Sequence, residues 1–404
     1  MALCSHSRFL ILTFLLIIFA AGKAVCIPPA SLERYSPLKP LTLDVNLSRV
    51  YVDLKGIKGF GVREFNRVDG FTIYYGLTIG GRFEETDPQL DATALYYTDR
   101  SRLGWILDFH KSFERLGYST IGLTYCRVTD TYDRWRMGDL ESSLASFVLK
   151  ESFRNYYERE GLSVYLTTEV ADWFSFRVSY TGEDHKSVVA GNPFTIPGDA
   201  KEFRDNPMID DGRFGALTFT FTYDSRDNIR LPHIGWYHEG IVEVSRNWLR
   251  SDFSYTRWFI QMRRYHPLRF GQFVNLRLAV AGSSGHILRQ RLLTAGGVGT
   301  LRGYDDLSLV GDHMVLANAE YRFPIGLLHF KPVLFLFNEL HGMLFFDAGK
   351  IWFKDLEDDA EFLSDVGVGL SGANLMSYFG VYLAWPLNGD NEGARLTIKI
   401  QRDF

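Results

Sequence analysis

An alternation of apolar and polar residues recurs along most of the chain. Its clearest instance is segment 394–404, where only Arg402 interrupts an apolar face made of Ala394, Leu396, Ile398, Ile400 and Phe404. Successive side chains of a β-strand point to opposite faces of the sheet, so the pattern predicts a strand with one apolar and one polar face. Four further segments show the same pattern: 217–223, 256–263, 274–280 and 315–323.

A half-buried strand of a soluble protein alternates in the same way, so a single segment would not decide the class of protein. A series of such segments, each about ten residues long, instead fits tilted strands between lipid and a polar lumen. No apolar run after the first residues approaches the length of about eighteen expected of a membrane-spanning helix. The longest candidate, Pro332–Phe337, stops at Asn338. We therefore predict an all-β protein, a transmembrane antiparallel β-barrel.

The strand count follows from the same segments. Roughly fifteen strands fit between Phe71 and Phe404, and segment 43–53 would add one. Because bacterial single-chain barrels have even strand numbers, we favour about sixteen strands, with twelve or fourteen as alternatives. Segment 139–160 has apolar residues at near-helical spacing and predicts a short helix or an ordered loop, whereas 182–212 predicts a long extracellular loop. Aromatic residues near strand ends are expected to form interfacial girdles, namely Trp236, Tyr237, Tyr265, Trp352, Tyr378 and Trp385.

The N-terminal residues predict export. Residues 1–24 combine a mildly basic start, an apolar run and small residues before a cleavage site after Ala24, which is typical of a secretory signal peptide. An N-terminal anchor helix is the alternative. Residues 25–69 would form an extended periplasmic lead-in or a first strand, and residues 70–404 the barrel.

Composition removes several other classes of protein. The formal net charge of −4 offers no basic field for nucleic acid, and three cysteines cannot build a disulfide scaffold. The glycine-rich run 296–304 is not a dinucleotide-binding loop, because Arg302 stands where the third glycine is needed. No nucleophile motif and no metal-spaced cluster occurs, so we expect no enzyme, no cofactor and no metal site. The acidic runs 210–211 and 357–359 are expected to be solvated, or to touch cations that bridge lipopolysaccharide.

Four segments in the second half carry motifs in a fixed order. They are Tyr223–Asn228, the loop residues Leu301, Arg302, Gly303 and Tyr304, the segment Asn318–Pro324, and a Phe-x-Asp-x-Gly strand made of Phe345, Asp347 and Gly349. In this order, and with an aromatic C-terminus, they resemble the BamA/TamA superfamily of outer-membrane proteins. That superfamily includes bacterial surface antigen proteins and two-partner secretion translocators. The resemblance covers roughly residues 218–404.

The chemistry of the two central motifs can be argued from the residues. Alternation places Asp347 on one face with Phe345 and Gly349, and we assign that face to the lumen. A carboxylate screened from water needs a cation, which Arg302 could supply in a bidentate pair. Gly303 would allow close approach to the wall. The resemblance implies the same contact, which holds the loop inside the barrel. A surface loop with a solvated Arg302 is the alternative.

The resemblance also implies a location, partners and a function. We expect a Gram-negative outer-membrane protein that contacts lipid and lipopolysaccharide and that aids insertion or translocation of protein or lipid clients. The alternative is a passive pore or a structural surface antigen without a client. Ile398, Ile400 and Phe404 resemble the C-terminal signal through which the barrel-assembly machinery would insert the chain. Segment 27–70 is too short for a complete periplasmic repeat of the kind that relatives carry, so we expect none.

Overall fold

The computed structural model describes residues 50–81, 86–114, 117–229, 231–325, 339–355, 360–373, 378–389 and 393–400. Sixteen strands form one antiparallel sheet in which each strand pairs with the next, so the all-β fold and the favoured strand number are confirmed. The strands are β1 Val50–Asn66, β2 Gly70–Gly81, β3 Gln89–Tyr97, β4 Arg102–Phe113, β5 Tyr118–Asp130, β6 Tyr157–Ala171, β7 Phe174–Ser187, β8 Gly212–Asp224, β9 Gly235–Ser245, β10 Tyr255–Pro267, β11 Phe273–Gly285, β14 His313–Pro324, β15 Glu339–Trp352, β16 Leu363–Ala373, β17 Tyr378–Pro386 and β18 Arg395–Ile400.

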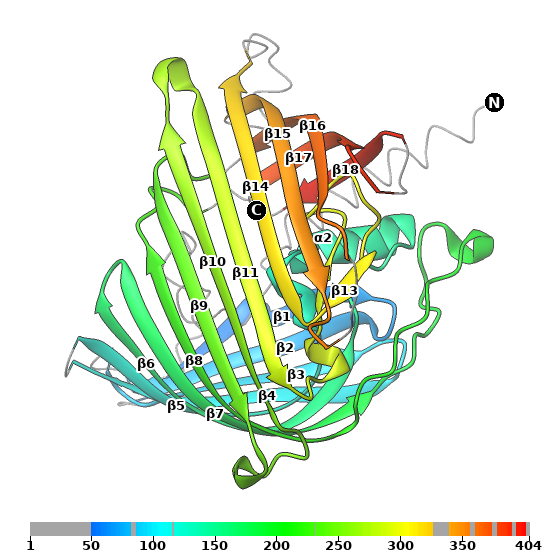
Figure 1. Ribbon diagram of the computed structural model, residues 1–404. Helices are drawn as coiled ribbons and strands as arrows, with labels where there is room; N and C mark the ends of the chain where they lie inside the picture. Colours follow the sequence, from blue (N-terminus) through cyan, green and yellow to red (C-terminus); the bar gives the residue numbers. More distant parts are fainter. Residues whose placement is uncertain are drawn as a thin grey trace.

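The sheet curls strongly, so that β1 and β18 form its two edges and come round towards each other (Figure 1). A second, two-stranded sheet joins β12 Leu293–Ala295 to β13 Leu309–Gly311. Within the part of the chain that is described, no helix has the length and apolar character needed to cross a membrane. β1 lies within the range 25–69 that the sequence left open as lead-in or first strand. Residues 43–49 lie outside the described residues.

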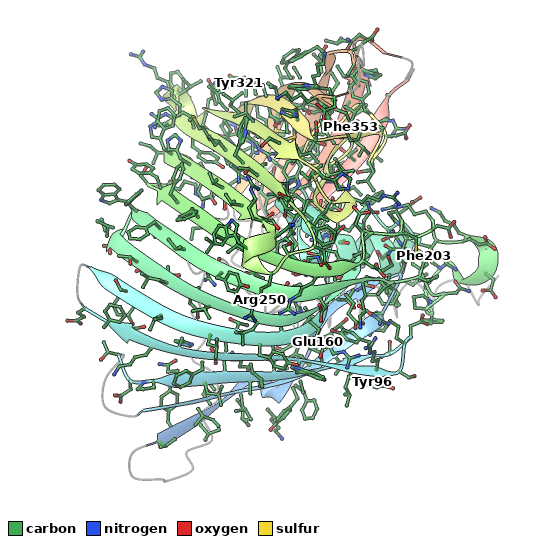
Figure 2. All side chains as sticks on the ribbon, turned by 60° about the horizontal axis from the view of Figure 1, so that its bottom comes forward. Tyr96, Glu160, Phe203, Arg250, Tyr321 and Phe353 are labelled. Carbon is green, nitrogen blue, oxygen red and sulfur yellow. The ribbon has the colours of Figure 1, made fainter. Side chains whose placement is uncertain are left out.

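The two faces of the sheet differ in polarity, and side chains project from both (Figure 2). On β15 the side chains of Leu344 and Phe346 are 50% and 44% exposed, whereas Phe345 and Asp347 point inward and are buried. The convex surface is therefore an apolar band and the concave surface carries the polar groups. That polarity suits a wall between lipid and a wet lumen.

The predicted aromatic girdle needs correction at three positions, one of which is Tyr237, whose ring contacts the guanidinium of the inward-pointing Arg263. Trp236 and Trp385 are exposed on the convex face, as expected of girdle residues. Tyr265 and Tyr378 are instead fully buried on the concave face, where the Tyr378 hydroxyl hydrogen-bonds that of Tyr382 at 2.7 Å. The prediction was wrong there because alternation, rather than closeness to a strand end, decides the face. Tyr265 lies two residues after the buried Arg263 on the same strand, so both side chains point to the same face.

The three long connections named next lie at one rim of the sheet. In an antiparallel meander successive connections alternate between the two ends, and these three are the fifth, seventh and eleventh connections of the sixteen-stranded sheet. They are residues 131–156, 188–211 and 286–312. The first contains the predicted helix: α2 Asp139–Leu144 continues into the π-helical turn η2 Ala145–Leu149. The second is shorter than expected. β7 continues to Ser187 because its polar end still pairs with both β6 and β8.

Candidate functional site: a lumenal loop anchored on the barrel wall

The loop between β11 and β14 folds back onto the concave face. The short β12–β13 sheet closes its base, and the glycine-rich run 296–304 lies between these two strands. Gly297 and Gly299 have φ angles of 74° and 84°, which residues with a side chain rarely adopt. A Cβ on Gly299 would also collide with the backbone oxygen of Arg136. The glycines therefore allow a compact tip that other parts of the chain approach closely.

Arg302 joins this loop to two strands of the wall. Its Nε lies 2.7 Å from Oδ2 of Asp347 and its Nη2 lies 2.7 Å from Oδ1, which is a bidentate pair with β15. Its Nη1 donates to Oε1 of Glu320 on β14, also at 2.7 Å. All three side chains are buried. The predicted residues Arg302 and Asp347 are thus brought together, and Glu320 shares the guanidinium with Asp347.

Further groups surround the Arg302 guanidinium. Its central carbon lies 3.7 Å from the ring centre of Phe345 and 5.0 Å from that of Tyr382, so both rings supply cation–π contacts. Asn318 donates to the backbone oxygen of Thr300 and to Oδ1 of Asp347, at 2.7 and 2.8 Å. The loop is therefore joined to the wall by the ion pairs of Arg302 and by the side-chain amide of Asn318.

The ion pairs stabilise the charged form of Arg302. Burial disfavours its charged form, but the coulombic attraction of Asp347 and Glu320 outweighs burial, so the pKa of Arg302 lies well above its usual value. A second guanidinium, that of Arg322, donates from Nε to Oε2 of Glu320 at 3.1 Å. Two cations and two carboxylates thus alternate in the buried cluster. Removing one member would leave a partner charged and buried, which costs about 3–5 kcal/mol in such clusters.

The other residues of the loop motif also contact the wall. Leu301 is fully buried in an apolar cluster that includes Phe259 and Leu316. The Tyr304 hydroxyl lies 2.8 Å from the backbone oxygen of Ser364, on β16, and 2.8 Å from that of Asn388, which follows β17. A Cβ on Gly303 would lie 2.7 Å from Cβ of Asp365, so the backbone passes directly over β16.

The remaining expected site residues lie elsewhere. Gly349 lies against β14, where a Cβ would lie 2.9 Å from the backbone oxygen of Val315. Ile398 is exposed on the convex face of β18, and Ile400 ends that strand. Phe404 lies outside the described residues. Asn318, Glu320 and Tyr382 had no assigned role in the sequence. Residues 318, 320 and 322 alternate with the apolar face of their strand. This placement on the inner face was the signal that could have identified Asn318 and Glu320.

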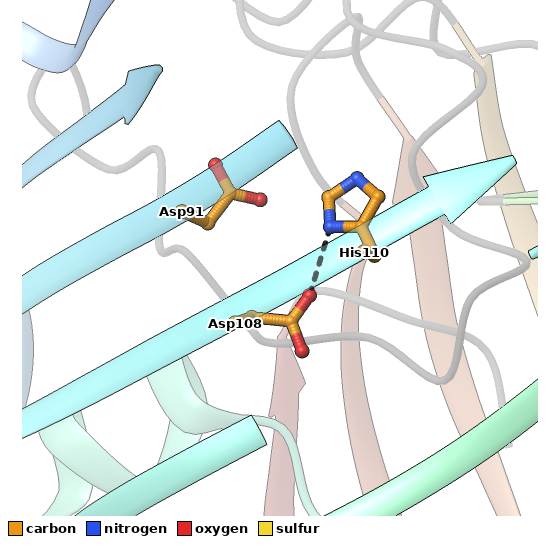
Figure 3. Close-up of side chains that lie close together, drawn as sticks. All are labelled: Asp91, Asp108 and His110. Atoms are coloured by element: carbon orange, nitrogen blue, oxygen red, sulfur yellow. Dashed lines mark hydrogen bonds and ion pairs between the residues drawn. The ribbon is translucent and has the colours of Figure 1, made fainter. Parts of the chain in front are cut away.

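A second polar cluster on the lumenal face has the residue types of a metal site. Asp91 of β3 lies directly opposite Asp108 of β4, and His110 hydrogen-bonds Asp108 at 3.0 Å between Nδ1 and Oδ2 (Figure 3). The Lys55 ammonium, however, lies 2.8 Å from Oδ1 of Asp91 and already supplies a positive charge there. We therefore describe the cluster as a charge network of the wall and assign no metal to it.

Comparison with known proteins assigns the chain to a family. Residues 141–397 match the Omp85 superfamily domain. The chain belongs to the Omp85 superfamily. Residues 47–220 also match the C-terminal domain of DUF5686, a family of unknown function. No curated protein matches the chain.

A solved structure of BamA shows the same fold at low sequence identity. BamA from Haemophilus ducreyi lacking POTRA domains 1–3 is 15% identical with a TM-score of 0.56, and the match covers 87% of this chain and 69% of that one. CdiB from Escherichia coli is 10% identical with a TM-score of 0.48, covering 87% and 61%. This Omp85 chain thus spans less than two thirds of that CdiB. The superfamily and the apolar outer wall place this protein in the Gram-negative outer membrane, as predicted.

Proposed function

We propose that this Omp85 protein aids the insertion or translocation of proteins or lipids at the outer membrane and catalyses no covalent reaction. The observation that supports the proposal most is the buried anchor of the lumenal loop, in which Arg302 joins Asp347 and Glu320. Burying charges is costly, so a barrel that served only as a structural surface protein would gain little from keeping them.

The position of the anchor bears on how the barrel would work. Arg302 and Tyr304 attach the loop to β14, β15 and β16 and to the chain next to β17, all close to the β18 edge. Among the described residues, no ladder of hydrogen bonds joins β1 to β18. In our proposal the loop keeps the C-terminal strands in register while the seam between β1 and β18 opens, or thins the adjacent bilayer, for a client.

The proposal includes partners of three kinds. Outer-membrane lipid and lipopolysaccharide would contact the apolar convex face. The barrel-assembly machinery would insert the chain through the C-terminal signal at Ile398, Ile400 and Phe404. Clients would be proteins or lipids in transit. Co-purification from native membranes with the full chain would identify the client and any accessory protein.

Replacing Arg302 tests the role of the loop. We expect Arg302→Ala to insert as a folded barrel, seen as heat-modifiable migration, and yet to fail to complement depletion of the wild-type protein. Failure would appear as unassembled barrel proteins or misplaced phospholipid in the outer membrane. The matched control is Arg289→Ala, which removes a mostly exposed arginine of the same loop and should complement fully.

Two other outcomes would contradict the proposal in different ways. Full complementation by Arg302→Ala would refute the role of the anchor. If depletion of the wild-type protein disturbs neither barrel proteins nor lipid asymmetry, and the purified chain conducts ions, the protein is a passive pore.

A further inference from the structure

The seam between the two edge strands is not empty. Helix α2, from the β5–β6 connection, lies between β1 and β18 and packs against both of them (Figure 1). An open strand edge presents N–H and C=O groups that another strand can pair with. The segment that covers the edge of β1 therefore controls when the N–H and C=O groups of this edge can pair with another strand.

α2 supplies the edge of β1 with a hydrogen-bond partner. The backbone N–H of Phe65 donates to Oγ of Ser143, at 2.9 Å, where a neighbouring strand would otherwise offer a carbonyl. Just beyond, the ring of Phe147 lies 5.2 Å from that of Phe65 and 5.3 Å from that of Phe71 on β2. A polar and an apolar contact thus hold the helix against the first hairpin.

Buried charges reinforce the same contact. Asp139, at the start of α2, accepts from Nη1 of Arg154 at 2.7 Å and from Nε of Arg134 at 3.2 Å. The same Nη1 lies 3.8 Å from Oε2 of Glu64 on β1. Glu64, Asp139 and Arg154 are all buried. The helix is therefore held against β1 by a cluster of opposite charges. Separating the helix from β1 would leave buried charges of this cluster without their partners.

The other side of the connection reaches β18 through the lumenal loop. A Cβ built on Gly299 would meet the backbone oxygen of Arg136, two residues before the cap of α2, and would lie 3.1 Å from Nζ of Lys399 on β18. Nη1 of Arg277, on β11, donates to the backbone oxygen of Gly299 at 2.7 Å. The β5–β6 connection, the tip of the anchored loop and the last strand therefore meet at one point.

We propose that segment 139–149, which we call the seam clip, is a displaceable latch. Its helix α2 packs against both β1 and β18, and the clip seals the rim end of the seam in the resting barrel. Opening the seam requires the clip to leave β1, which frees the Phe65 N–H and breaks the bridge that Arg154 makes between Asp139 and Glu64. The latch itself does not depend on which client the proposed function assigns.

The first test loosens the clip without touching the Arg302 anchor. The double variant Ser143→Ala/Phe147→Ala removes the hydrogen bond and the aromatic contacts, and the control Leu149→Ala alters a 54% exposed residue of the same segment. In planar bilayers we expect openings of the purified full chain to become about tenfold more frequent in the double variant only, since about 1.4 kcal/mol corresponds to a factor of ten. Hydrogen exchange at 60–66 should accelerate in parallel. Unchanged exchange and conductance in a folded double variant would overturn the proposal.

The second test fixes the clip in place. In a chain whose native cysteines are serine, Phe65→Cys and Phe147→Cys are joined by a short, reducible bis-thiosulfonate linker. We expect the cross-linked protein to stop opening and to recover when dithiothreitol cleaves the linker, with each single-cysteine variant unaffected. Openings that persist after cross-linking would show that the helix is a fixed brace. If the clip controls conductance while depletion disturbs no client, the proposed function fails and the latch stands.

Discussion

At the scale of single residues, the structure is governed by buried charges that balance one another. Glu320 is the member of the lumenal cluster that both guanidiniums share, because it accepts from Arg302 at one oxygen and from Arg322 at the other. Glu320→Gln keeps the shape of the side chain and removes its charge. Both arginines then lack part of their compensation, although Asp347 still pairs with Arg302.

We expect Glu320→Gln to lower the free energy of unfolding by about 3–5 kcal/mol, measured by urea titration in lipid vesicles. The double variant Glu320→Gln/Arg322→Met removes one charge of each sign, so it should lose less stability than the sum of the two single variants. Additive losses would mean that the charges do not interact through the cluster.

At the scale of elements, the anchored loop depends on glycines at which the chain turns and other backbone comes close. Gly299 combines a φ of 84° with a collision between an added Cβ and the Arg136 backbone. Gly198 has a φ of 58° but nothing within 4 Å of an added Cβ. An alanine there therefore tests the effect of backbone strain without a collision. Gly299→Ala should therefore displace the loop, whereas Gly198→Ala should not.

Trypsin provides the measurement, because Arg302 is buried while the loop is in place. We expect folded Gly299→Ala barrels in vesicles to be cut after Arg302, and Gly198→Ala barrels to resist cleavage at that residue as the wild type does. Equal resistance of both variants would show that the loop tolerates the added methyl group.

The elements also show what a sequence can and cannot reveal. Alternation located the strands and their faces, because the period of two is fixed by the backbone. The ends were less accurate: the polar residues Gly182–Ser187 still extend β7, since hydrogen bonding to two neighbours outweighs composition. The role of Glu320 was missed because it depends on which strands lie side by side. The place of α2 at the seam rests on contacts between segments 75 or more residues apart, such as Phe65 with Ser143, which are 78 apart.

At the scale of the whole molecule, the polarity of a soluble protein is inverted: the outer surface is apolar and the charges lie inside. Family membership and this polarity together imply that lipid contacts the convex face. Two leucines of similar exposure separate a lipid contact from a water contact. Leu344 lies on the convex face at the middle of β15, and Leu149 lies in the connection at the rim.

The last prediction places an arginine at each of these two leucines. At mid-depth in a bilayer an arginine on the lipid face costs about 2–4 kcal/mol, whereas at a wetted rim the cost is near zero. Leu344→Arg should therefore lower the urea midpoint of folding into vesicles, and Leu149→Arg should leave the midpoint unchanged. Because the two side chains expose similar fractions of their surface, a difference between the variants reports the surrounding solvent rather than burial in the protein. Equal effects would mean that the middle of β15 does not face lipid, and the wall would then have to be placed differently in the membrane.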